Sequence, residues 1–308
     1  MQIWALGRAA QPSVLKAEDA NYDHVGPSAI PMPDRPAPRP LTKDEIHEYA
    51  QWYAQAAHNA VIEAGFDGVE LHGANGYIID QFLQDVSNQR DDEYGGSVEN
   101  RSRFALEMVD AVVKAVGPER TAIRLSPAGS VQGMVGRSML IGTFIYMMLG
   151  MGGMDDSRAQ FSHVVSSLKV QHPKLAFLDL VEPRFVGVFE ESSSTEVTND
   201  YIRDIWAPKR LVSSGGFTLE SAIERADRTG DLVAFGRLFI SNVGLLFLVL
   251  NIDGMLTSSF QPDIIYKLKN KIPLTPYNRK TFYLPGDTTN NGYTDYPFAE
   301  EQIAESRL

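Results

Sequence analysis

The sequence predicts an α/β fold of the (β/α)8-barrel type in which the set of eight strands is incomplete. Short apolar segments with strand character alternate with amphipathic helical segments along the 308-residue chain, which is typical of βαβ units around a parallel sheet. Polar residues able to do chemistry follow directly after strand ends, as they do in such barrels. Five internal strands and a partial sixth at the N-terminus can be recognised, whereas a closed barrel of this kind has eight.

A regular series of elements fills this pattern. Residues 27–40 are rich in proline and predict an extended surface loop. Residues 42–45 have the form of a helix capping box, and apolar residues at helical spacing continue from there towards Gly65, which can end the helix. A second long helix is expected between Ser97 and Gly117. The expected strands cover residues 2–6, 66–71, 121–125, 175–181, 210–213 and 232–235, and the expected shorter helices cover residues 161–170, 201–206 and 219–226.

Two apolar runs, residues 135–153 and 243–261, interrupt this alternation. The apolar stretch in each is shorter than the about 20 residues that a membrane-spanning helix needs. Both runs are nevertheless too apolar for exposed loops. They are therefore either buried core helices or insertions that are foreign to the fold.

Composition excludes several classes of function. A net charge of −11 disfavours nucleic acid as a partner, because a phosphate backbone binds a basic face. The absence of cysteine removes disulfides and thiolate chemistry, and together with an N-terminus that lacks a signal-peptide pattern it leads us to expect a cytoplasmic protein without a membrane partner. The six histidines are scattered without ligand spacing, so we expect no metal site and disfavour a metal-dependent hydrolase.

Residues 68–77 are the most informative segment, because an apolar strand leads there directly into His72, Asn75 and Tyr77. His72 and Asn75 can each offer an N–H donor to one oxygen, and Tyr77 adds a hydroxyl that can supply a proton. Two donors and a proton source suit a reaction that builds up enolate charge. The alternative is a polar strand end whose groups are satisfied locally, and the trio alone does not decide between the two.

A longer signature surrounds this trio and resembles a known family. It includes Gln81-Phe82-Leu83, the run SNQRDDEYGGSVENR at residues 87–101, and Arg124-Leu125-Ser126-Pro127. Further matches lie at residues 181–184, 214–217, 235–242, 279–283 and 292–297. In these residues the sequence closely resembles the old yellow enzyme family, the FMN-dependent ene-reductases built on a (β/α)8 barrel. The resemblance covers most of the chain except the two apolar runs.

The resemblance implies a catalytic role for each member of the trio. His72 and Asn75 would bind the carbonyl oxygen of an α,β-unsaturated carbonyl compound, and Tyr77 would protonate its α-carbon. NADPH or NADH would reduce the FMN, which in turn would reduce the alkene. Relatives that isomerise their substrates lack the tyrosine donor, so the presence of Tyr77 favours reduction. The physiological substrate cannot be named, and the oligomeric state is open, with a homodimer as one alternative.

The resemblance also implies a flavin site. Gln2 would hydrogen-bond the flavin ring, and Arg124 would lie near its N1–C2 carbonyl edge, where a positive charge stabilises the anionic reduced flavin. The remaining implied positions are a phosphate site at Gly215, Gly216, Gly236 and Arg237, an aromatic contact to the flavin at Phe282, and a substrate pocket lined by Trp4 and Tyr283. Several of these have a simpler alternative: an internal ion pair for Arg124, plain turns for the glycines and Arg237, and packing of the C-terminal tail for Phe282 and Tyr283.

The chain also departs from the family pattern. Family members begin well upstream of this sequence, and the additional part holds the first two barrel strands and most of the third. We therefore expect residues 1–308 to form a single, incomplete barrel domain with insertions at 135–153 and 243–261. The second run begins with valine and ends with glutamine, whose codons can carry the GT and AG ends of an intron. Our hypothesis is a gene model with a late start and retained introns, and the alternative to an active enzyme is a catalytically inactive remnant that does not bind FMN.

Overall fold

The computed structural model describes residues 1–32, 35–129, 131–134, 157–183, 185–186, 189–190, 198–242, 246–250, 256–260, 263–270, 272–282, 289, 291–293 and 295–296. These residues fall into two compact units, Met1–Ala234 and Phe235–Leu308. Each unit is described by itself.

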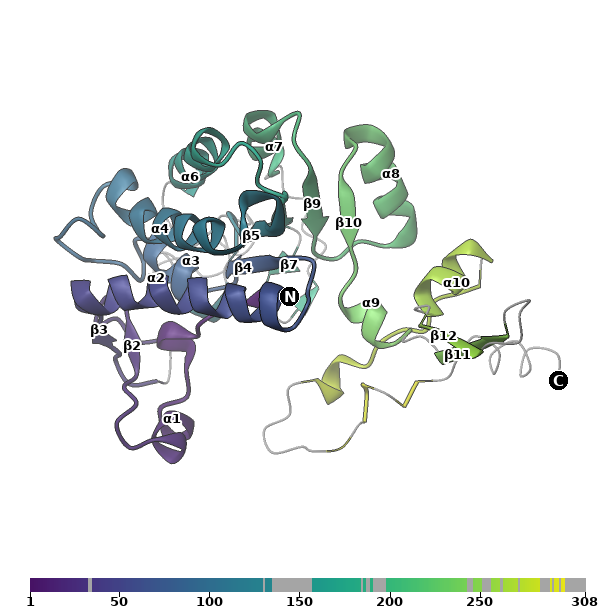
Figure 1. Ribbon diagram of the computed structural model, residues 1–308, viewed down its shortest axis with the longest axis horizontal. Helices are drawn as coiled ribbons and strands as arrows, with labels where there is room; N and C mark the ends of the chain where they lie inside the picture. The colour runs from purple at the N-terminus through teal and green to yellow at the C-terminus, as the bar shows by residue number, and fades with distance from the viewer. Residues whose placement is uncertain are drawn as a thin grey trace. The chain divides into compact units, whose positions relative to one another are not determined.

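A six-stranded parallel sheet forms the centre of the first unit (Figure 1). The sheet is open in the described part of the chain, with the first and last strands at its edges, and neighbouring strands pair in parallel throughout. Each of the six predicted strands is confirmed with small shifts of its ends. In spatial order the strands are β1 (Gln2–Ile3), β4 (Val69–Gly73), β5 (Thr121–Leu125), β6 (Phe177–Val181), β9 (Leu211–Ser214) and β10 (Leu232–Ala234).

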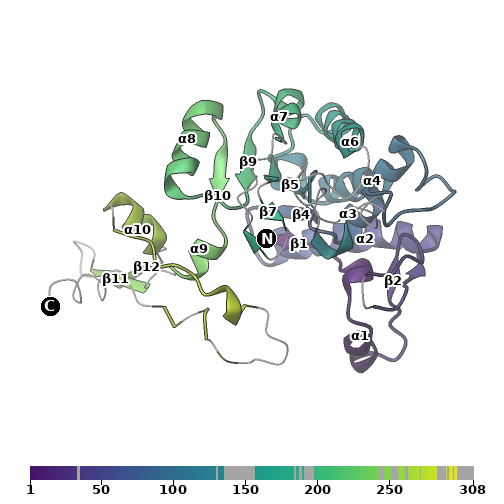
Figure 2. The ribbon, with the colours of Figure 1, turned by 180° about the vertical axis from the view of Figure 1, so that it is seen from behind.

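The helices of this unit follow the strands along the sheet (Figures 1 and 2). The capping box predicted at residues 42–45 is present: Thr42 Oγ1 accepts from the backbone N–H of Glu45, and Glu45 Oε2 accepts from that of Thr42. The five predicted helices correspond to α2 (Lys43–His58, continued by the π-helix η2, Asn59–Glu63), α4 (Val98–Val116), α6 (Ser157–Gln171), α7 (Asp200–Trp206) and α8 (Leu219–Thr229). The sequence pattern does not reveal η1 (Gly7–Ala9), α1 (Pro12–Glu18), α3 (Ile78–Leu83), η3 (Pro118–Arg120), η4 (Val131–Gly133) and the strand pair β7 (Phe185–Val186) and β8 (Phe189–Glu190).

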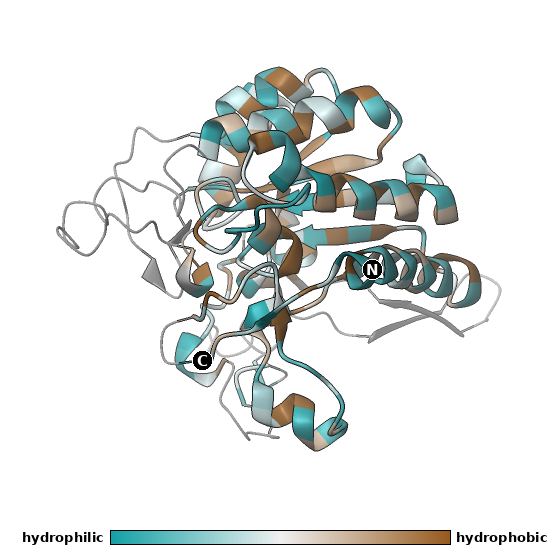
Figure 3. Cartoon of the chain, turned by 90° about the vertical axis from the view of Figure 1, so that its left-hand side faces the viewer, coloured by the Kyte–Doolittle hydropathy of each residue, from teal (hydrophilic) through white to brown (hydrophobic). Residues whose placement is uncertain are grey.

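The two faces of the sheet differ in chemistry, because successive side chains of a strand point to opposite sides. On one face, Val69, Leu71 and Ile123 join the main apolar core with residues of the surrounding helices, such as Phe104 and Phe161. Those helices carry both apolar and polar residues along their length, as expected for elements that are buried on one side (Figure 3). The alternate positions on the same strands carry polar and charged side chains: Gln2, Glu70, His72, Arg124, Asp179 and Ser214.

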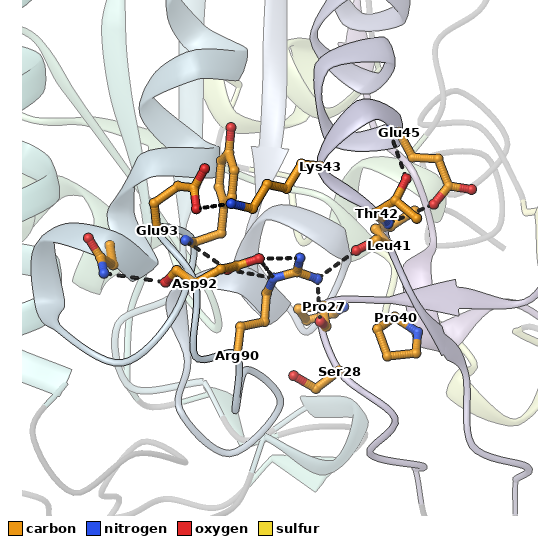
Figure 4. Close-up of polar contacts among 12 residues, drawn as sticks. Pro27, Ser28, Pro40, Leu41, Thr42, Lys43, Glu45, Arg90, Asp92 and Glu93 are labelled. Carbon is orange, nitrogen blue, oxygen red and sulfur yellow. Dashed lines mark hydrogen bonds and ion pairs between the residues drawn. The ribbon is translucent and has the colours of Figure 1, made fainter.

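The run at residues 87–101 forms a polar clamp outside the sheet (Figure 4). Arg90 Nη1 donates to the backbone oxygens of Pro27 and Leu41, at 3.0 and 2.7 Å, and Arg90 Nη2 pairs with Asp92 Oδ2 at 2.6 Å. Lys43 Nζ, in the first turn of α2, lies 2.5 Å from Glu93 Oε2. This long part of the family signature therefore fastens a loop to the start of α2 instead of supplying catalytic groups.

Replacing Arg90 with alanine should lower the free energy of unfolding by about 2 kcal/mol, because it leaves two backbone oxygens and Asp92 without their main donor. Urea unfolding measures the change. The matched control is Arg103→Ala, since Arg103 is exposed and its Nε donates to a single backbone oxygen, that of Glu93, among the described residues. Equal loss of stability in the two variants would contradict a clamp at Arg90.

The prediction of a surface loop at residues 27–40 is wrong for Pro27, Ser28 and Pro38, which are buried. The last two residues of the stretch are exposed and form β3 (Arg39–Pro40), which pairs in parallel with β2 (Val25–Gly26) just before the stretch. The cause is tertiary: Ser28 Oγ accepts from the backbone N–H of Gln89, next to the contact of Pro27 with the polar clamp. Proline content predicts an extended chain, but it does not reveal what covers that chain.

The apolar run at residues 135–153 lies outside the described residues. In the second run, β11 (Leu246–Leu250) and β12 (Leu256–Phe260) form an antiparallel pair, so a core helix is wrong for these residues. The backbone N–H of Ile264 donates to the oxygen of Asn242, so the chain leaves and returns at neighbouring points. This arrangement suits an insertion, which stays a prediction. The other elements of the second unit are α9 (Arg237–Ile240), α10 (Asp263–Lys269) and η6 (Arg279–Thr281).

Within the part of the chain that the structure describes, no helix is long and apolar enough to cross a membrane. The same residues contain no group of histidine, aspartate and glutamate side chains arranged to hold a metal ion.

Candidate active site

A tight turn at the end of β4 brings the predicted trio together. Asn75 and Gly76 both adopt left-handed backbone conformations, with φ values of 57° and 77°. These two residues reverse the chain, so Tyr77 becomes the N-cap of α3 and its ring centroid lies 5.0 Å from that of His72. The structure therefore places a histidine at the carboxyl end of a parallel strand, and an asparagine and a tyrosine in the turn that follows it.

His72 is held in its neutral form by its surroundings. The residue is 5% exposed, and its Nδ1 has no hydrogen-bond partner among the described residues. Burial, assisted by the nearby charge of Arg124, lowers the pKa of His72 to about 4. At neutral pH the ring is therefore uncharged and offers one N–H donor.

This lowered pKa makes the stability of the protein depend on pH in a defined window. The ring binds protons less readily in the folded state than in the unfolded state, so stability is complete above about pH 6.5 and falls as the pH drops towards 4. Between pH 7 and pH 5 we expect His72 to cost the protein about 1–2 kcal/mol. Urea unfolding of wild type and His72→Gln at both pH values isolates this contribution, and an identical pH dependence in the two proteins would refute it.

Trp4 lies beside the trio, as the predicted pocket requires. Its ring centroid is 6.3 Å from that of Tyr77 at an interplanar angle of 48°, and the residue is 52% exposed. An exposed indole next to Tyr77 can provide an apolar wall for a substrate.

Next to His72, the polar face of the sheet carries a layer of charged and amide groups. Arg124 Nη2 donates to Ser214 Oγ at 3.1 Å, and Arg124 Nε lies 3.8 Å from Asp179 Oδ2. Gln2 Nε2 donates to Glu70 Oε1 at 2.6 Å. Burial raises the pKa of the carboxyl groups of Glu70 and Asp179. The ion-pair alternative for Arg124 is therefore present in the structure.

The same layer fits the polar edge of a flavin ring, which alternates hydrogen-bond donors and acceptors. Arg124 contributes a cation, and its buried Nε has no hydrogen-bond partner among the described residues. The side-chain oxygen of Gln2 can accept from a ring N–H while its nitrogen donates to Glu70. Arg124 and Gln2 can thus serve a bound FMN without losing the contacts that hold them.

The predicted phosphate site is divided between the two units. Gly215 and Gly216 follow β9 in the first unit and have positive φ values of 103° and 67°, which favour glycine. Gly236 and Arg237 belong to the second unit, where Arg237 Nη1 donates to the hydroxyl of Tyr277 at 2.6 Å. The phosphate site therefore stays a prediction.

The two aromatic positions of the C-terminal part have different outcomes. Phe282 is 7% exposed, and its ring packs against Tyr277 and Tyr293 with centroid distances of 5.9 and 5.3 Å. Packing within the second unit, the simpler alternative, is thus observed for Phe282, and a flavin contact stays a prediction. Tyr283 lies outside the described residues.

The sequence patterns did not single out the side chains that support the trio. Glu70 and Asp179 interrupt otherwise apolar strands, and this break in the pattern could have identified them. Gln81 and Ser126 stand inside the family motifs without a role of their own, and Asp80 follows Gly76 by four residues, within reach of its backbone N–H.

Comparisons with known proteins agree with the geometry. The profile of the NADH:flavin oxidoreductase / NADH oxidase family matches residues 1–251. The chain is 40% identical to a protein of Epichloe festucae var. lolii named probable inactive reductase easA, over 100% of this chain and 72% of that protein. It is 41% identical to chanoclavine-I aldehyde reductase fgaOx3 of Penicillium roqueforti (strain FM164), over 98% of this chain and 71% of that protein. The structure of Old Yellow Enzyme from Pichia sp. AKU4542 matches with a TM-score of 0.74 and 31% identity, over 97% of this chain and 69% of that chain.

The residues matched by the family profile include the parallel sheet, His72 and the turn that leads to Tyr77. The family implies FMN as cofactor and a nicotinamide nucleotide as hydride donor for a small-molecule substrate. The chain therefore belongs to the NADH:flavin oxidoreductase / NADH oxidase family, as an oxidoreductase of the Old Yellow Enzyme type whose described residues form an incomplete (β/α)8 barrel.

Proposed function

We propose that the protein is an ene-reductase that uses FMN and NADPH, or alternatively NADH, to reduce the C=C bond of α,β-unsaturated carbonyl compounds. The observation that carries this proposal is a neutral His72 near the carboxyl end of β4, followed directly by the turn that carries Asn75 and leads to Tyr77. When bound, FMN supplies the hydride that the alkene receives.

His72 and Asn75 bind the carbonyl oxygen of the substrate through N–H donors. Negative charge develops on this oxygen as the β-carbon is reduced, and fixed donors in a buried site stabilise it without having to reorganise. Because His72 is uncharged, it donates a hydrogen bond and keeps its own proton. The negative charge of the enolate therefore stays in the substrate, and its α-carbon can be protonated.

Tyr77 delivers that proton to the α-carbon. Its ring lies near the rings of both His72 and Trp4, which holds the phenol beside the bound carbonyl group. A phenol O–H is a suitable general acid, and positioned proton transfer contributes typically 10²–10⁴-fold to a rate.

Two steps with the purified protein test the proposal. The first is an absorbance spectrum, which shows whether FMN is bound, followed by anaerobic addition of NADPH or NADH, which bleaches a competent flavin. The second is addition of 2-cyclohexen-1-one, which should restore the flavin absorbance and yield the saturated ketone. Bleaching without reoxidation by the enone would overturn alkene reduction.

A colourless protein that takes up no FMN would instead favour the second candidate, a non-catalytic remnant. The observation behind this candidate is the similarity to a relative that is itself named a probable inactive reductase. The comparison of NADPH with NADH in the bleaching step also identifies the preferred donor.

A further inference from the structure

The turn that carries Asn75 and Tyr77 is held by side chains from outside it. The backbone N–H of Asn75 donates to Ser126 Oγ at 2.8 Å, and that of Gly76 donates to Asp80 Oδ2, also at 2.8 Å. The backbone oxygen of Gly76 accepts from Gln81 Nε2 at 2.7 Å. Three peptide groups of a four-residue reversal are therefore paired with side chains.

These three side chains are themselves inaccessible to solvent. Asp80 and Gln81 are 0% exposed and Ser126 is 1% exposed. Ser126 Oγ donates to Asp80 Oδ2 at 3.4 Å, which links two of them. Gln81 Oε1 accepts from the backbone N–H of Arg8, and Gln81 Nε2 also donates to the oxygen of Leu6. The group is thus a connected buried network that joins α3, the end of β5 and the N-terminal segment.

The turn needs such support because its backbone is unusual. Asn75 has a φ of 57°, a conformation that costs a side-chain-bearing residue free energy and persists only where its surroundings hold it. A side chain at Gly76 would approach the backbone oxygen of Val131 to 2.8 Å, so the turn is also enclosed from the other side. If the turn relaxed, the amide of Asn75 and the phenol of Tyr77 would both move relative to His72.

We propose that Asp80, Gln81 and Ser126 are positioning residues that fix Asn75 and Tyr77 relative to His72, so that one carbonyl compound meets both N–H donors and the proton donor at once. This inference rests on the proposed function, which it deepens. Displacing a positioned group by about 1 Å can cost about 10²-fold in rate, so the loss of one support should be measurable.

The decisive variant is Ser126→Ala, which removes the acceptor for the Asn75 N–H. We expect kcat/KM for 2-cyclohexen-1-one to fall about tenfold, since the loss of one hydrogen bond shifts the turn without destroying it. The absorbance spectrum of bound FMN should not change. The matched control is Ser102→Ala, which removes a buried hydroxyl of α4 that binds Gln160 and the oxygen of Val98 and should leave kcat/KM unchanged.

Hydrogen exchange gives a readout that is independent of catalysis. In the Ser126→Ala variant the backbone N–H of Asn75 should exchange at least tenfold faster than in wild type, whereas the Ser102→Ala variant should leave it protected.

The Asp80→Asn variant tests the second support, because asparagine can replace the hydrogen bonds of Asp80. Gln84 Nε2 donates to Asp80 Oδ1, and a flipped Gln84 amide can accept from the new amide, so Asp80→Asn should retain most activity whereas Asp80→Ala should not.

The outcomes separate this inference from the proposed function. If wild type does not reduce the enone, the proposed function fails. Hydrogen exchange of the backbone N–H of Asn75 then remains as the test of the network. Unchanged protection of amide 75 in Ser126→Ala would overturn the network, and so would faster exchange combined with an unchanged kcat/KM. Equal losses of kcat/KM in Ser126→Ala and Ser102→Ala would indicate a general effect on the fold and would also overturn it.

Discussion

Replacing Tyr77 with phenylalanine should slow the reduction of an α,β-unsaturated ketone by ~10²–10⁴-fold, the usual contribution of a positioned general acid. The variant keeps the ring that lies near Trp4 and His72, so the site retains its shape. The anaerobic bleaching of the flavin by NADPH should keep its wild-type rate, because no proton reaches the alkene in that half of the cycle. Stopped-flow absorbance measures the two halves separately.

The matched control for this prediction is Tyr49→Phe. Tyr49 lies on α2, packs against Trp52 and Phe104, and also loses only a hydroxyl. Both half-reactions should be unchanged in this variant. Enone reduction by Tyr77→Phe at the wild-type rate would remove the tyrosine from the mechanism and would point to water as the proton source.

The sequence alone predicts the framework of the first unit well, because its signals are local. The six strands and the five predicted helices each carry their own periodicity, and the capping box at Thr42 forms as expected. The apolar run at 243–261 is harder to interpret, since a short apolar stretch suits a buried helix and a strand equally. Its described residues form a hairpin, which the spacing of apolar residues does not distinguish.

In the candidate site, too, the residues that are close in sequence can be predicted, whereas the contacts between distant residues cannot. His72, Asn75 and Tyr77 lie within six consecutive residues, so the sequence alone is enough to predict their association. Ser126 and Asp179 follow from strand pairing and burial: Arg124 is the register partner of Asp179, and Ser126 lies just beyond β5. A contact between Ser126 and the Asn75 N–H joins residues 51 positions apart, and no periodicity reports such a contact.

The neutral state of His72 could not be predicted from the sequence either, because it results from the burial of the side chain in the folded protein. A histidine at the end of an exposed strand would titrate near its ordinary pKa, whereas the surroundings of this one lower the pKa to about 4. The contribution of His72 to the binding of carbonyl compounds should therefore stay nearly constant from pH 6 to pH 8.

Removing the donor of His72 should have the second large effect on catalysis. His72→Leu should lower kcat for enone reduction by ~10²–10³-fold, corresponding to ~3–4 kcal/mol for one donor to a developing oxyanion. The histidine is buried, so leucine preserves apolar contact but offers no N–H, and the leftover charge on the substrate oxygen is borne by Asn75 alone. Pre-steady-state reoxidation of the reduced flavin by the enone measures this step directly.

His72→Gln provides the matched comparison, because its amide can offer an N–H donor to the same oxygen. If stabilisation of the oxyanion is the role of His72, the glutamine variant should recover part of the rate that the leucine variant loses. Equal losses in both would mean that the imidazole is needed for its shape or its contact with Tyr77. A leucine variant as fast as wild type would mean that Asn75 alone supports the charge, which a single half-buried amide does not normally achieve, since water competes with it for the same oxygen.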